Sequence, residues 1–175
     1  NYFAKIIKVL KSFLSWASEK GYNTNREFEK FKAPEHDIDI VFLTFEELMI
    51  LYEKEFETER LSHVRDFYCM GCFTGLRFSD LEKLHLANIS EDHILLSIQK
   101  TKTQNHAIKL NKYAKAILEK YKGTIYEPLP RISSQKFNEY IKECCELAEI
   151  SQLLTIHWFV GNKKKSLTQP KYKFI

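Results

Sequence analysis

The chain has 175 residues, enough for one domain, or for one domain and a part of another. With 44% hydrophobic and 14% aromatic residues it can build a packed core, and no apolar run is long enough to cross a bilayer. The net charge of +4 is local, because residues 161–175 hold five lysines and no acid. The rest of the chain carries 22 basic and 23 acidic residues.

The first segments predict a helix, a linker and a second helix. Residues 2–20 repeat apolar side chains at helical spacing, and residues 22–40 are polar, with mixed charge. Thr44 and Glu47 have the spacing of a capping box, which predicts a helix over residues 45–56. The chain begins with Asn and not with Met, and its first residues do not resemble a signal peptide. We therefore expect it to begin inside a longer gene product.

The next segments predict a helical joint that contains an arginine. An apolar helical run over residues 59–74 ends at Gly75, which can take the positive φ that terminates a helix. Ser79 and Glu82 again have capping-box spacing, so we expect a short helix to begin near Asp80 and to end near residue 84. Arg77 then lies between two helices.

The second half predicts a hairpin followed by two helices. Residues 94–99 and 106–110 have the composition of strands, and residues 99–122 hold seven lysines and one glutamate. Asn111 is expected to cap a helix that Gly123 ends, and Ser133 or Ser134 to cap another. Beyond His157 there is no convincing period. The overall expectation is a mainly α chain with a small antiparallel sheet, an α+β class.

Four cysteines are present: Cys69, Cys72, Cys144 and Cys145. The first two lie in an apolar helical run, and the adjacent second pair lacks the spacing of a zinc ribbon. We expect all four to be reduced residues in or near the core of a cytoplasmic protein, with a zinc site as the weaker alternative.

Arg77 is the first candidate functional residue. A rigid guanidinium beside the N–H groups of a helix start can hold a phosphate with two parallel hydrogen bonds. The alternative is an ordinary surface pair between Arg77 and Asp80. The eight residues 74–81 do not decide between the two.

Three segments in order resemble the motifs of one family. They are Thr74-Gly75-Leu76-Arg77-Phe78-Ser79-Asp80-Leu81, then Gln99-Lys100-Thr101-Lys102-Thr103 with Ile108-Lys109-Leu110, and then Leu154-Thr155-Ile156-His157. This order resembles the tyrosine recombinases, or phage integrases, especially those of Bacteroides-type mobile elements. The resemblance covers residues 1 to about 157. It implies the last helix of a core-binding domain at 1–22, a linker at 23–40, an incomplete catalytic domain at 41–157 and an aberrant basic tail at 158–175.

The resemblance implies roles for several side chains. In this family a tyrosine attacks a DNA phosphodiester without a metal or other cofactor, and cationic side chains stabilise the transition state. Arg77 would be the first phosphate-gripping arginine, with Asp80 orienting it or capping the short helix. Lys102, or less favourably Lys100, would protonate the leaving oxygen, and Lys100, Lys102 and Lys112 would contact DNA. His157 would be an acid–base or phosphate-orienting group, or else a half-buried histidine beside Trp158.

The same resemblance also exposes departures from the family pattern. Val160 stands where the family has its second arginine, and Gly161 stands where it has a further polar group. No tyrosine can be assigned as the nucleophile, since Tyr172 lies too close to His157. The other candidates precede the histidine: Tyr113, Tyr121, Tyr126 and Tyr140.

Three explanations stay open for this ending, with the first favoured. The first is a frameshift near codon 157 or a truncation, in which case the tail lysines say nothing about function. The second is a degenerate recombinase that keeps only DNA binding. The third is an arrangement in which another subunit supplies the missing groups. We expect double-stranded DNA as the partner and no membrane, with a tetramer in the complete family enzyme. The alternatives to a recombinase are a non-catalytic DNA-binding protein and, less favoured, a helical protein without a nucleic-acid role.

Overall fold

The computed structural model describes residues 2–32, 39–98, 103–160 and 163–175. Within these ranges the chain forms six α-helices, a three-stranded antiparallel sheet and a two-stranded antiparallel sheet. This confirms the predicted mixture of helices with a small antiparallel sheet, whereas the second sheet is not part of the prediction. The chain divides into two compact units, a small unit of residues 1–40 and 155–168 and a large unit of residues 41–154 and 169–175.

The small unit begins with α1 (Tyr2–Glu19), which confirms the predicted first helix. A short 3-10 helix, η1 (Glu27–Lys30), follows in the predicted linker. Lys11 of α1 donates a hydrogen bond from Nζ to the carbonyl oxygen of Glu29 at 2.9 Å. The described part of the linker is therefore tied to α1, and residues 33–38 of the predicted linker lie outside the described residues.

The large unit opens with the predicted capping box. Glu47 N donates to Thr44 Oγ1 at 3.3 Å, and Thr44 N donates to Glu47 Oε2 at 2.7 Å. These two bonds satisfy N–H groups at the start of α2 (Phe45–Glu53). The helix is three residues shorter than predicted, because the backbone of Lys54 is already extended, with ψ 124°.

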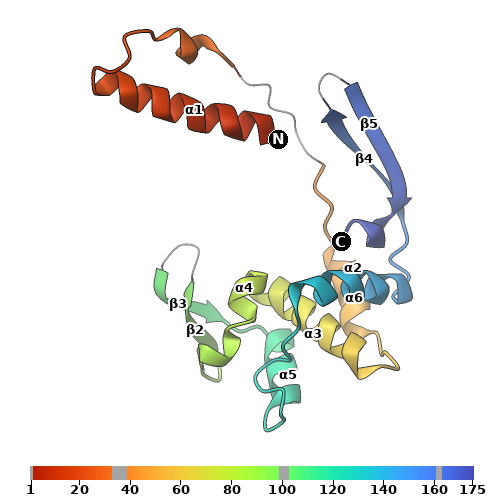
Figure 1. The fold of residues 1–175 in the computed structure, drawn as a ribbon. Coiled ribbons are helices and arrows are strands. Elements are labelled where there is room, and N and C mark those ends of the chain that lie inside the picture. The colour runs from red at the N-terminus through yellow and green to blue at the C-terminus, as the bar shows by residue number, and fades with distance from the viewer. Residues whose placement is uncertain (1, 33–38, 99–102, 161–162) are drawn as a thin grey trace. The chain divides into compact units, whose positions relative to one another are not determined.

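The central helix of the large unit is α3 (Glu59–Thr74), which has the predicted bounds. It packs against α2, α4 (Phe78–Leu81), α5 (Lys112–Tyr121) and α6 (Ser134–Leu147), and Figure 1 shows these helices around it. Its buried side chains include Phe67 and Met70, which are 1% and 0% exposed. As predicted, Gly75 ends the helix with a positive φ of 71°.

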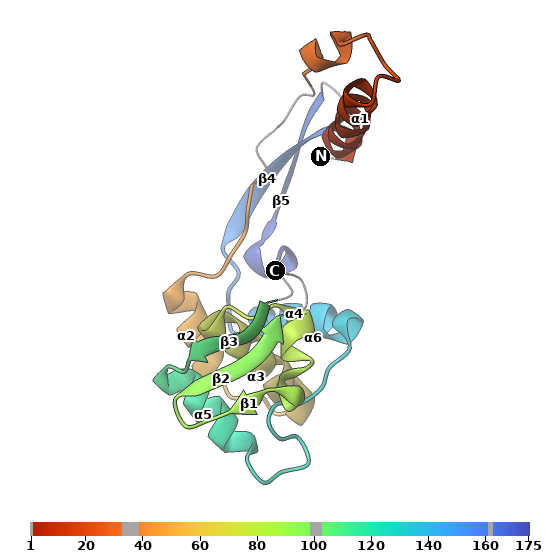
Figure 2. The same ribbon diagram turned by 90° about the vertical axis from the view of Figure 1, so that its left-hand side faces the viewer.

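The three-stranded sheet contains the predicted hairpin. After the 3-10 helix η2 (Leu84–Leu86), the chain forms β1 (Asn88–Ile89), β2 (His93–Ile98) and β3 (Thr103–Lys109), with strand order β1-β2-β3. Ile94 pairs with Ile108, which fixes the register of β2 and β3. Figure 2 shows the three-stranded sheet in front, with helices of the large unit behind it. The strands confirm the predicted hairpin, and β1 is an addition.

Two capped helices complete the core of the large unit. Asn111 caps α5 (Lys112–Tyr121), and Ser133 caps α6 (Ser134–Leu147), in agreement with the sequence. The side chains of Ile117 and Ile141, one from each helix, are 2% and 1% exposed. Burial of such side chains is the main source of stability for a unit of this size.

The tail beyond His157 forms regular structure that its sequence does not predict. Strands β4 (Leu153–Val160) and β5 (Lys163–Pro170) pair, and a 3-10 turn, η3 (Lys171–Lys173), follows. Most side chains of these strands are exposed, so the strands lack the alternation of apolar and polar residues that marks a half-buried strand.

The last residues belong to the large unit. The Lys171 side chain is 7% exposed, and its ammonium lies 2.5 Å from Glu47 Oε2, the oxygen that also accepts the capping bond of α2. Tyr172 and Ile175 pack against the core beneath α6. The C-terminal segment therefore stabilises the start of α2 through a largely buried ion pair.

The cysteine prediction is confirmed for three of the four positions. All four thiols are free, and those of Cys69, Cys144 and Cys145 are buried. Burial raises the pKa of Cys144 and of Cys145 to about 12, so both are neutral thiols. The prediction is wrong for the exposure of Cys72, which lies at the surface. Among the described residues no group of three or more His, Cys, Asp or Glu side chains could hold a metal ion.

The described helices also include none with the length and apolar character needed to cross a membrane.

Replacing Lys171 with methionine should destabilise the large unit. The change keeps the aliphatic stem but leaves the Glu47 carboxylate without its cation, which should lower the free energy of unfolding by about 2 to 3 kcal/mol. Urea unfolding followed by circular dichroism measures the loss. Lys173→Met is the matched control, because Lys173 is exposed and only lies over the Tyr172 ring. Equal small losses for the two variants would contradict the role given to the buried pair.

Candidate nucleic-acid interface

Arg77 lies at the surface in the joint between α3 and α4. Its backbone is extended, with φ −75° and ψ 158°, and its carbonyl oxygen accepts from Asp80 N at 2.9 Å to start α4. The side chain is exposed. In the described part of the chain, the guanidinium has no hydrogen-bond or ion-pair partner. No described residue therefore occupies its N–H groups, which can donate to an external acceptor.

Two details of the predicted joint are wrong. The N-cap of α4 is Arg77, so the helix starts one residue before Ser79, and no side chain caps it. Asp80 does not pair with Arg77 at the surface, because its side chain is directed into the protein and the residue is 3% exposed. Its Oδ1 has no hydrogen-bond partner among the described residues. The carboxylate therefore neither neutralises Arg77 nor caps α4.

Asn111 ties the start of α5 to the end of α3. Its Oδ1 accepts from the backbone N of Tyr113 and of Ala114, at 3.1 and 2.9 Å, and its Nδ2 donates to the carbonyl oxygen of Phe73 at 3.3 Å. The rings of Phe73 and Tyr113 stack with centroids 5.0 Å apart. Since Phe73 precedes Arg77 by four residues, these contacts hold the first turn of α5 beside the helix joint.

The lysines from 109 to 122 divide into paired and unpaired groups. Three form ion pairs with carboxylates: Lys115 with Asp92, Lys120 with Asp66, and Lys122 with Glu119. The pairing is strong enough that Lys115 lowers the pKa of Asp92. Lys109 and Lys112 are exposed and form no ion pair with a described carboxylate, although Lys109 is near enough to help lower the pKa of Asp92.

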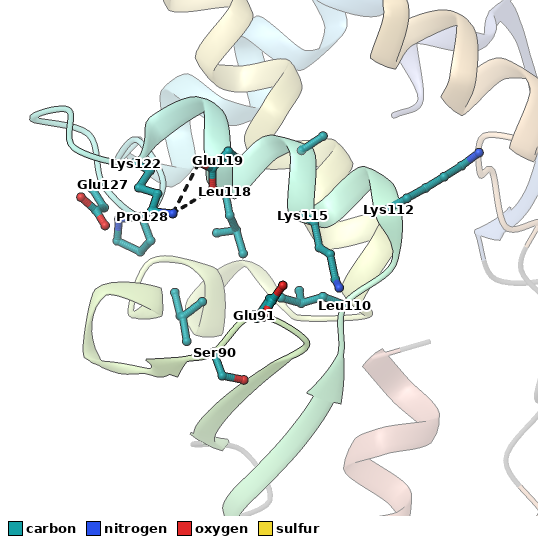
Figure 3. Close-up of a pocket in the computed structure, with 12 residues that line it drawn as sticks. Ser90, Glu91, Leu110, Lys112, Lys115, Leu118, Glu119, Lys122, Glu127 and Pro128 are labelled. Atoms are coloured by element: carbon teal, nitrogen blue, oxygen red, sulfur yellow. Dashed lines mark hydrogen bonds and ion pairs between the residues drawn. The ribbon is translucent and has the colours of Figure 1, made fainter.

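Lys112 occupies the first turn of α5, next to the Asn111 tie. Its ammonium lies 4.9 Å from the centroid of the Tyr113 ring. Figure 3 shows its side chain extending away from the others drawn, whereas Lys115 turns toward Leu110. The predicted DNA-binding residue Lys112 is therefore a free surface cation close to the joint that carries Arg77.

The remaining predicted cationic site residues lie either outside the described residues or in the small unit. Lys100 and Lys102 lie outside the described residues, although the strands on either side of them form the predicted hairpin. His157 belongs to the small unit, where its backbone N donates to Asp39 Oδ2 at 2.8 Å. Its side chain is half-buried, and its Nδ1 lacks a partner among the described residues. The structure thus defines only the Arg77 and Lys112 part of the predicted site.

Tyr172 has a structural contact that agrees with leaving the nucleophile unassigned. Its hydroxyl donates to Glu146 Oε1 at 2.8 Å. This hydrogen bond raises the pKa of Tyr172, because the neutral phenol is the donor that the carboxylate needs. A phenol held in this state is a poor nucleophile.

An open groove of about 800 Å³ lies beside α5 and is not anticipated by the sequence. Ile89, Leu110 and Leu118 form apolar parts of its wall, and Figure 3 shows charged side chains from both of its sides. The lining has both signs of charge: Lys112, Lys115 and Lys122 with Glu91, Glu119 and Glu127. This balance gives the groove no net attraction for phosphate, so of its lining we include only Lys112 in the candidate interface.

Comparisons with protein-family models, curated proteins and solved structures gave no match for this chain.

Replacing Asn111 with alanine should separate the start of α5 from the end of α3. The variant loses the helix cap and the bond to Phe73, so its free energy of unfolding should fall by about 1 to 2 kcal/mol. Asn138→Ala, at an exposed position within α6, is the matched control and should change stability by about 0.5 kcal/mol or less. Thermal unfolding of both variants tests the tie, and equal stability of the two would exclude it.

Proposed function

We propose that this chain is a relative of the tyrosine recombinase catalytic domain that binds double-stranded DNA and does not cleave it alone. The observation that carries the proposal is the exposed guanidinium of Arg77, which has no partner among the described residues and lies in a helix joint fixed by Gly75 and Asn111. The order of the three sequence motifs is the reason for proposing this family.

The charges near this joint support phosphate as the ligand. A guanidinium can hold two oxygens of one phosphate with parallel hydrogen bonds, and an ammonium acts as a point charge for another. Because Arg77 and Lys112 form no ion pair with a carboxylate in the described ranges, neither has to give up such a pair when a phosphate binds. Neutralising DNA phosphates releases counterions, which makes such binding depend on salt.

Strand cleavage needs groups that this chain does not offer. Val160 stands at the position of the second arginine, and loss of one such donor from a charged transition state typically reduces rates by about 100- to 1000-fold. Tyr172 is hydrogen-bonded to Glu146, and the position of a nucleophile remains unassigned. The proposed function is therefore DNA binding, with recombination as the activity of the complete family enzyme.

DNA binding should be salt-dependent and should decrease in Arg77→Ala and Lys112→Glu. Each lost phosphate contact should reduce the slope of log K against log salt by about 0.9, and each variant should bind about tenfold or more weakly at low salt. Fluorescence anisotropy with a labelled duplex of about 30 base pairs is the measurement. Lys136→Glu, an exposed lysine at the start of α6, controls for charge reversal. Binding that does not depend on salt, or equal loss in the control, would reject the proposed site.

Incubation with a nicked suicide substrate should leave no covalent protein–DNA adduct after denaturation. The expected result follows from the missing second arginine and nucleophile. A denaturing gel with labelled DNA detects an adduct directly. An adduct that disappears in Tyr172→Phe would show that this chain cleaves DNA and would contradict the assignment of Tyr172 to a structural contact.

A further inference from the structure

The pair of strands β4 and β5, here called the basic ribbon, carries charge of only one sign. Residues 153–170 contain Lys163, Lys164 and Lys165 and no aspartate or glutamate. All three lysines are exposed, and none has a carboxylate partner among the residues that the structure describes. The ribbon is thus a concentrated cationic surface that does not include Arg77.

The register of the ribbon follows from a cross-strand contact. Thr155 Oγ1 and Thr168 Oγ1 lie 2.8 Å apart, which places these residues opposite each other. Continuing this antiparallel pairing places Lys165 opposite Trp158 and Lys163 opposite Val160. The outward N–H of His157, bonded to Asp39, agrees with this register, because alternate residues of an edge strand direct their N–H groups away from the partner strand.

Alternation then sorts the side chains onto two faces. One face carries Lys163 and Lys165 together with Trp158, Val160 and Leu167, and the opposite face carries Lys164. Trp158 is 38% exposed, Val160 53% and Leu167 39%. Cations and exposed apolar groups therefore alternate along one narrow face.

We propose that the basic ribbon is a second DNA-binding element that enters a groove of the duplex. A two-stranded ribbon fits the major groove, where lysines can reach the flanking phosphates and apolar side chains can contact thymine methyl groups. The inference rests on the proposed DNA-binding function and adds a contact that does not involve Arg77 or Lys112. We choose DNA as the partner of the ribbon because the exposed lysines complement the charge of a polyanion.

A bilayer is a poorer partner for the same surface. The lysines lie at the end of the ribbon where the strands are joined, and insertion of that end would bury ammonium groups in hydrocarbon. Two paired strands also leave backbone N–H and C=O groups unpaired along their outer edges, which a bilayer core does not satisfy. Water-filled grooves of DNA impose neither penalty.

The two ends of the ribbon are anchored within the large unit. Lys171 N donates to the carbonyl oxygen of Gln152 at 2.8 Å, and the Lys171 side chain is held by Glu47. These contacts bring together the residues that precede β4 and follow β5. Anchored ends reduce the entropy lost when the strands order on a ligand.

The test uses the full chain with Lys163, Lys164 and Lys165 all changed to glutamine. Anisotropy titrations with a duplex of about 30 base pairs should show a salt slope smaller by about 2 to 3 and binding weaker by about tenfold or more. A matched triple variant with Lys54, Lys122 and Lys136 changed to glutamine removes the same charge from other exposed positions and should keep most of the slope. In a Trp16→Phe background, the fluorescence of Trp158 should change when duplex is added.

The possible outcomes separate the ribbon from the Arg77 site. A smaller slope in the triple lysine variant, together with a Trp158 signal in the Trp16→Phe chain, supports the ribbon, whatever Arg77→Ala does. If the triple lysine variant keeps the wild-type slope and Arg77→Ala binds duplex more weakly, the ribbon is overturned and the proposed function is retained. If wild type binds no duplex, both fall. A last measurement uses vesicles that contain about 30% phosphatidylserine. If the chain binds them more tightly than duplex, and the triple lysine variant does not bind them, the ribbon is overturned as a DNA element and a membrane surface is indicated.

Discussion

The Asn111 side chain provides the constraint on which the candidate interface depends. It satisfies two N–H groups at the start of α5 and also donates to the last turn of α3. The two helices are far apart in sequence, yet this amide and the Phe73–Tyr113 stack hold their ends together. The turn at Gly75 then starts a new segment with Arg77 at its first cap position. A surface arginine is thereby placed by main-chain geometry instead of by an ion pair.

The cations that form no ion pair say more about the candidate interface than the number of lysines does. Two of the three lysines of α5 form ion pairs, Lys115 with Asp92 and Lys120 with the buried Asp66, which reduces the charge that they offer to external ligands. Arg77, Lys109 and Lys112 differ from them in having no such partner in the described residues. The charge pattern of the sequence marks the region, and the contacts select the residues within it.

Local signals in the sequence predict much of the fold. The capping box at Thr44, the cap at Asn111 and the stop at Gly75 all have a mechanism that acts within four residues, and all three are confirmed. The prediction that Ser79 caps the helix is wrong because the four-residue helix begins at Phe78, with Arg77 as its N-cap and no side-chain cap. Burial of Asp80 and of Lys171 depends on tertiary packing, which periodicity does not reveal. The roles of Lys100, Lys102 and His157 stay predictions.

Hydrogen exchange of the full chain with and without duplex DNA tests the central claim most directly. Backbone amides exchange more slowly where a ligand covers or stabilises them. The account predicts slower exchange at residues 75–82 and 109–115 in the presence of DNA, with little change at residues 118–128. Protection that is absent from residues 75–82, while DNA is demonstrably bound, would contradict Arg77 as a phosphate-binding residue.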